Sequence, residues 1–78
     1  MTTVDLTQLE EGKSGRVVLI SGGHGLIRRL ESLGIRVGKN VTKVSSQLMR
    51  GPVTLRIDGF QVAVGFGMAK KILVETKR

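Results

Sequence analysis

Cysteine, tryptophan and tyrosine are absent from this chain, and its only aromatic residues are Phe60 and Phe66. Without cysteine, neither a disulfide framework nor a thiolate metal site can stabilise the fold, and the absence is consistent with a reducing cytoplasm. Proteins that bind single-stranded nucleic acid usually stack the bases on aromatic rings. The scarcity of such rings makes nucleic acid an unfavoured partner.

Long apolar runs are missing as well. No run in the sequence approaches the roughly 18 residues that a membrane-spanning helix requires. The first residues, Met1 to Asp5, lack the basic and apolar regions of a signal peptide. We therefore expect a cytoplasmic protein, and its 78 residues suffice for one domain, 1–78, with a thin core.

Groups that could carry out catalysis or hold a metal are few. His24 is the only imidazole in the chain, and no nucleophile or orienting group pairs with it in sequence. Zinc or ferrous iron needs three or four ligands, whereas the chain offers one histidine and scattered carboxylates. The glycine loop at 22–25 matches neither the P-loop pattern nor the dinucleotide-binding fingerprint. We expect no enzyme, no metal site and no cofactor.

Positive charge is abundant by contrast. The chain has thirteen Lys and Arg residues and six Asp and Glu residues, which gives a formal net charge of +7. Such a field favours an acidic partner: nucleic acid, an anionic membrane surface or the acidic face of another protein. A small domain also carries such charge for solubility alone, so the excess does not choose among these partners.

One stretch has the periodicity of a short helix. Its apolar residues recur with helical spacing and would form one stripe: Leu26, Ile27, Leu30 and Leu33. Gly34 follows the last of them and can take the left-handed conformation that ends a helix, with Ile35 packing back on the final turn. The sequence therefore predicts a helix that ends at Leu33.

The remaining chain has the composition of a β-sheet. Leu6, Leu9 and Gly12 predict a turn that closes one end of a barrel. Asp58-Gly59 suits a type I′ turn and predicts a hairpin. A single helical turn is expected at Met68–Lys71, after the loop Gly65-Phe66-Gly67. Five strands are expected: 16–21, 40–46, 52–57, a fourth after Asp58-Gly59 whose inward face runs from Val62 and Val64 through Phe66, and 72–75, with a loop at 47–51. The predicted fold is mainly β: a small, partly open, SH3-like five-stranded barrel with one short α-helix inserted after the first strand.

Five segments follow one another over nearly the whole length of the chain: Leu6-x-x-Leu9-x-x-Gly12, Arg28-Arg29-Leu30-Glu31-Ser32-Leu33-Gly34-Ile35-x-x-Gly38, Gly51-Pro52-Val53, Gly59-x-x-Val62-Ala63-Val64 and Ala69-x-x-Ile72-x-Val74. Together they resemble the FeoA family of bacterial ferrous iron transport. Many family members carry an arginine after the apolar triplet, where this chain has Gly65.

The resemblance implies a cytoplasmic SH3-like domain that assists transport without carrying iron itself. Members work with FeoB, a membrane protein with a cytosolic GTP-binding domain that moves Fe(II) inward. The implied role is protein–protein contact with a FeoB-like transporter at the inner face of the cell membrane, so that any membrane association is indirect. A homo-oligomer stays open.

The partner surface is expected on the inserted helix and its flanking loop. We assign it, as a hypothesis, to Arg28, Arg29, Leu30, Arg36 and Lys39. The alternative functions are a small basic barrel that binds RNA or DNA, or a regulatory SH3-like domain of the repressor type. The sequence has no helix-turn-helix to read a DNA groove, which disfavours the repressor.

Overall fold

The structure is a computed structural model and describes residues 1–46 and 51–77. The described chain contains six strands and two helices, in the order β1 (Thr2–Asp5), β2 (Ser14–Ile20), α1 (His24–Ser32), β3 (Asn40–Ser46), β4 (Val53–Ile57), β5 (Phe60–Val64), α2 (Phe66–Ala69) and β6 (Ile72–Thr76). The expected loop at 47–51 lies mostly outside the described residues.

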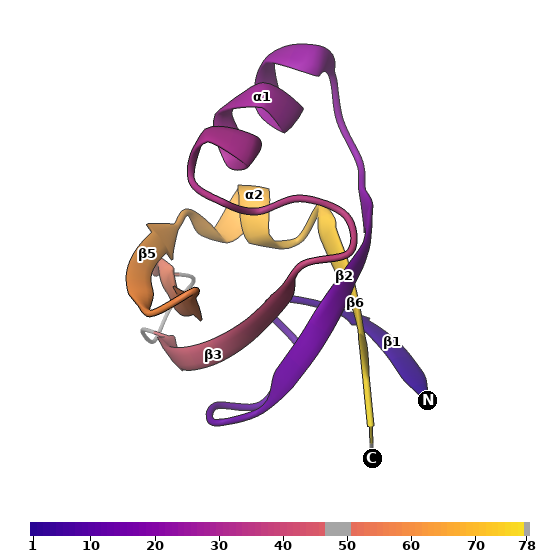
Figure 1. Ribbon diagram of the computed structural model, residues 1–78, viewed down its shortest axis with the longest axis vertical. Coiled ribbons are helices and arrows are strands. Elements are labelled where there is room, and N and C mark those ends of the chain that lie inside the picture. Colours follow the sequence, from indigo (N-terminus) through magenta and orange to yellow (C-terminus); the bar gives the residue numbers. More distant parts are fainter. Residues whose placement is uncertain (47–50, 78) are drawn as a thin grey trace.

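All six strands form one antiparallel sheet with the order β1-β6-β2-β3-β4-β5. The sheet curls without closing, so β1 and β5 remain its two edges (Figure 1). β2 lies between β6 and β3, in the interior of the sheet. The expected mainly β architecture with one short inserted helix is confirmed.

The strand count differs from the expected five because β1 was not foreseen. β1 has four residues and pairs with β6, so that Thr2 lies opposite Thr76. This pairing joins the two ends of the chain, which lie close together in Figure 1, and no local pattern predicts it. The helix therefore follows the second strand rather than the first.

The core lies inside the curled sheet and extends under α1. Leu6 and Leu9 are buried in it, as expected for a turn that closes the barrel. Asp5 holds this turn, because its Oδ1 accepts hydrogen bonds from the backbone N–H groups of Thr7 at 2.8 Å and Gln8 at 3.2 Å. The other buried apolar residues are Val17, Ile20, Leu30, Ile35, Val41, Val53, Leu55, Ile57, Val64, Ala69, Ile72 and Val74.

The predicted hairpin turn is confirmed by backbone geometry, whereas the predicted helical turn begins earlier, within the loop expected at Gly65-Phe66-Gly67. Asp58 and Gly59 have φ angles of 51° and 84°, the positive values at both central positions that define a type I′ turn. β4 and β5 pair across it, with Ile57 opposite Phe60. α2 begins at Phe66, two residues before the expected helical turn, because the N–H of Ala69 already bonds to the carbonyl of Gly65 at 2.9 Å.

The end of α1 also follows the prediction. Gly34 has a φ of 94°, and its N–H donates to the carbonyl of Glu31 at 3.0 Å, while the N–H of Ile35 donates to Leu30 at 2.9 Å. These two bonds form a Schellman motif. Leu30 and Ile35 are fully buried, but Leu33 is 39% exposed, because the chain leaves the helix there and its side chain lies at the edge of the apolar stripe.

Candidate functional site

The inserted helix α1 stands at one end of the molecule, away from both termini (Figure 1). It has nine residues, too few to be stable alone in water, so it depends on its buried side. Leu30 is the residue of α1 that is fully buried, with Leu26 and Ile27 partly buried beside it. The opposite side of the helix is free to carry residues that serve something outside the fold.

Arg28 and Arg29 lie on that outer side and are exposed, as the helical spacing predicts. Arg36 is exposed in the loop that follows. Within residues 1–46 and 51–77, the ion pairs are Arg16–Glu75 and Lys39–Asp58, so none of these three arginines has a carboxylate partner. The structure thus brings three uncompensated cations to the end of the molecule that α1 occupies.

The other two expected partner residues are placed differently. Leu30 has no exposed surface, so in this structure it supports α1 from beneath and is out of reach of a partner. Lys39 is half-buried and its Nζ lies 2.5 Å from Oδ2 of Asp58 in the β4–β5 turn. Lys39 therefore fastens the loop after α1 to the hairpin instead of standing free beside the arginines.

A second contact joins α1 to the same hairpin. A methyl group placed on Gly34 would lie 3.5 Å from Cγ2 of Ile57, so the helix end sits directly against the end of β4. Ile57 is opposite Phe60 in the register, and residues opposite each other in an antiparallel pair project on the same side of the sheet. Phe60 nevertheless stays 74% exposed, because it stands at the open rim of the sheet.

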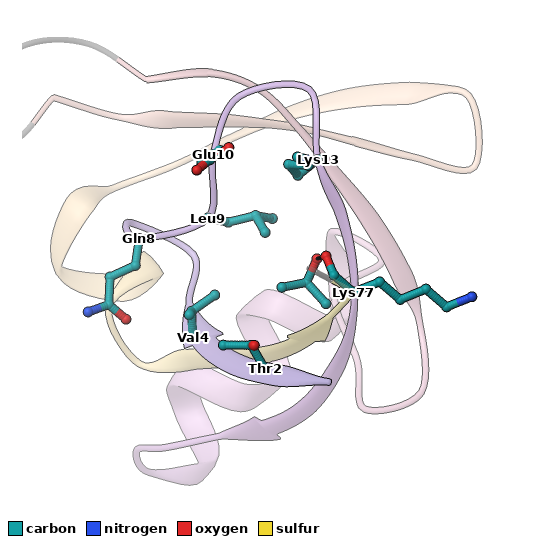
Figure 2. A pocket seen from close by; sticks show the side chains of 8 residues that line it. Thr2, Val4, Gln8, Leu9, Glu10, Lys13 and Lys77 are labelled. Carbon is teal, nitrogen blue, oxygen red and sulfur yellow. Dashed lines mark hydrogen bonds between the residues drawn. The ribbon is translucent and has the colours of Figure 1, made fainter.

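A shallow hollow lies at the far end of the molecule, near the termini (Figure 2). It measures about 260 Å³ and lies between β1, the loop before β2 and the end of β6. Leu9 points into it, whereas the Lys77 side chain extends away (Figure 2). Its lining combines two apolar residues with scattered polar ones: Thr2, Val4, Gln8, Leu9, Glu10, Lys13, Thr76 and Lys77. That lining contains no histidine or cysteine to act as base or thiolate nucleophile.

Lys43 is the buried charged residue that sequence reasoning did not single out. Only 3% of it is exposed, and its Nζ donates to the backbone carbonyl of Thr7 at 3.1 Å. Burial lowers the pKa of Lys43 from its usual value, and the nearby carboxylates of Glu11 and Asp5 oppose that shift. Lys43 ties the N-terminal turn to β3, so its role is structural. Its position in an alternating strand gave no sign of this.

Metal ligands do not gather anywhere in the described part of the chain. Within residues 1–46 and 51–77 there is no group of three or more His, Cys, Asp or Glu side chains arranged to hold an ion. Neither helix found in these ranges has the length and apolar character needed to cross a membrane.

Comparison with known proteins identifies the family. The model of the FeoA domain family matches residues 4–76. The chain belongs to the FeoA family. A relative from Methanocaldococcus jannaschii, named as a candidate Fe(2+) transport protein A, is 38% identical over 66 residues, which cover 85% of this chain and 78% of the relative.

Solved structures agree with this assignment. The crystal structure of an iron uptake regulatory protein (FeoA) superimposes with a TM-score of 0.89 at 30% identity, covering 99% of this FeoA chain and all of that one. The expected SH3-like fold is confirmed by this likeness. A manganese-dependent transcriptional repressor also superimposes, with a TM-score of 0.87 at 24% identity, over 96% of this chain and 42% of the repressor. At that identity the likeness concerns the fold alone.

Proposed function

We propose that this FeoA chain is a cytoplasmic accessory protein of ferrous iron transport that acts by contact with a FeoB-like membrane transporter and its GTP-binding domain. Membership of the FeoA family is the observation that carries the proposal. The relative's name refers to Fe(2+) transport, yet the described residues of this chain gather no metal-binding group. A transport protein of this kind would act by binding another protein rather than by chelating iron.

The arrangement of α1 supports contact as the mode of action. The sheet needs no helix between β2 and β3, and the helix that is present carries Arg28 and Arg29 on its outer side. These cations suit an acidic protein face, and charges at the rim of an interface mainly increase the rate of association. In the function we propose, the protein is not an enzyme, uses no cofactor, and reaches the inner face of the membrane through its partner.

Binding kinetics would test this function. The purified chain is offered to the immobilised cytosolic region of the FeoB-like transporter from the same organism, and separately to generic duplex DNA and RNA, at physiological salt. We expect saturable binding to the transporter region. Binding to nucleic acid should be weak at most, and added salt should abolish it, as for a purely electrostatic contact. Tight binding to nucleic acid, with none to the transporter region, would contradict the proposal.

A nucleic-acid or repressor function is the second candidate, since the net charge is +7 and a manganese-dependent repressor shares the fold. A second open hollow of about 510 Å³ has three basic residues in its lining, Lys13, Arg16 and Lys77. One of them, Arg16, is already paired with Glu75 at 3.4 Å. The aromatic rings that would stack on bases are not among its lining residues, which makes this candidate the weaker one.

A further inference from the structure

Five large apolar side chains are exposed on the described surface. They are Met1, Leu19, Leu33, Val37 and Phe60. Single exposed apolar residues are normal and need no explanation. Leu33 and Phe60 are different, because they come from distant parts of the sequence and each adjoins the contact between the end of α1 and β4: Leu33 directly precedes Gly34, and Phe60 lies opposite Ile57.

Two contacts hold the end of α1 and its following loop against the hairpin. Gly34, directly after Leu33, lies against Ile57, and Ile57 stands opposite Phe60. In the turn itself, Asp58 is paired with Lys39. The backbone segments that carry Leu33 and Phe60 are therefore held by the fold, and an apolar surface held in place loses little conformational freedom when a partner covers it.

Cations border the same place. Arg29 precedes Leu33 by four residues, so the two side chains are neighbours on one side of the helix. Arg36 follows Gly34 in the adjoining loop, and both arginines are exposed without an ion pair among the described residues. We call this surface the helix–hairpin junction: Leu33 and Phe60 with Arg29 and Arg36.

The pattern identifies the kind of partner. Aromatic residues and arginines are the types enriched at protein interfaces, where an apolar centre is surrounded by a polar rim. A second copy of this chain would bring the same arginines face to face across a two-fold axis, and the like charges would repel. The cations are complementary instead to an acidic protein surface that presents an apolar side chain of its own.

We propose that the helix–hairpin junction is the docking site for an acidic protein surface, with Phe60 and Leu33 as apolar anchors and Arg29 and Arg36 as the charged rim. This inference rests on the proposed function and names the residues through which it acts. The anchors hold the complex together and so determine the dissociation rate, whereas the rim sets the association rate.

The experiment compares matched variants in binding to the cytosolic region of the FeoB-like transporter. Phe60→Ser and Leu33→Ser remove the anchors, and Leu19→Ser is the control, since Leu19 is 50% exposed on β2, which β3 and β4 separate from β5. We expect each anchor variant to bind about tenfold more weakly, mainly by faster dissociation. The control should stay within about twofold of the unaltered protein. Arg29→Glu should instead slow association, most visibly at low salt.

Hydrogen exchange on the unaltered protein gives a second measurement that requires no substitution. On binding, amides of residues 33–37 and 58–62 should exchange more slowly, and those at Ser14–Ile20 should not change. If the unaltered protein binds, but the anchor substitutions do not weaken binding and exchange at these segments does not slow, the inference is overturned and the proposed function still stands. Failure of the unaltered protein to bind the transporter region would refute the proposed function, and the inference with it.

Two further probes distinguish other occupants of the junction. Phosphatidylserine vesicles and single-stranded oligouridine are offered in parallel, because a lone exposed aromatic ring beside arginines also suits a lipid surface or a base. We expect neither to bind in a way that depends on Phe60. Loss of vesicle or RNA binding in Phe60→Ser, with transporter binding unchanged, would overturn the assignment to an acidic protein.

Discussion

Replacing Leu30 by alanine tests whether α1 is held by the core beneath it. Leu30 has no exposed surface, and the substitution deletes its three outer carbon atoms. Such changes cost about 2 to 5 kcal/mol, depending on how far the surroundings collapse into the cavity. Because α1 is joined to the sheet only by loops and can settle inward, we expect about 3 kcal/mol of the free energy of unfolding to be lost.

That loss is large for a chain of this size. A 78-residue protein has a free energy of unfolding of roughly 4 to 12 kcal/mol, and for small domains each kcal/mol lowers the melting temperature by about 4 to 8 °C. The Leu30→Ala variant should therefore melt about 12 to 24 °C lower, as followed by circular dichroism. Leu33→Ala is the matched control, and it should cost less than about 1 kcal/mol because Leu33 is 39% exposed. Equal losses in the two variants would refute the placement of Leu30 in the core.

Three further results are expected. Arg28→Glu combined with Arg29→Glu should leave the melting temperature unchanged and slow association with the transporter region at low salt, since both residues are exposed without ion-pair partners in the described chain; unchanged association kinetics would place docking elsewhere. Burial lowers the pKa of Lys43 below its usual 10.5, so between the lowered value and 10.5 the unfolded chain binds more protons than the folded one, and stability relative to Lys43→Met should rise with pH across that window; urea unfolding from about pH 7 to pH 10 measures this, and a falling difference would contradict the shift. Calorimetry with Fe(II) should show no stoichiometric site of submicromolar affinity, because the described residues gather no ligand set.

Features set by neighbouring residues could be predicted from the sequence. The end of α1 depends on the positive φ of Gly34, and the hairpin depends on the positive φ angles of Asp58 and Gly59. β3 was expected at 40–46 and is found there, since the segment contains the β-branched residues Val41, Thr42 and Val44, which favour strands. In each case the determining interaction spans only a few residues.

Features set by distant residues could not be predicted. β1 forms because residues Thr2–Asp5 pair with β6, which comes from the other end of the chain. The ion pair of Lys39 with Asp58 requires the loop after α1 to pack on the hairpin. Phe60 alternates with Val62 and Val64, a pattern that suggests an inward position. Its side chain is nevertheless exposed, because it stands at the open rim of the sheet.

The candidate site divides in the same way, and this division separates binding from stability. Local spacing on α1 places Arg28 and Arg29 outside and Leu30 inside, so substituting an arginine changes the surface while leaving the support of the helix intact. Removing the Leu30 side chain loosens α1 and so displaces the exposed residues without touching any of them. Among Leu30 variants, the loss of binding affinity should therefore increase with the loss in the free energy of unfolding. A loss caused by Phe60 or Arg29 at unchanged stability identifies a residue that the partner touches.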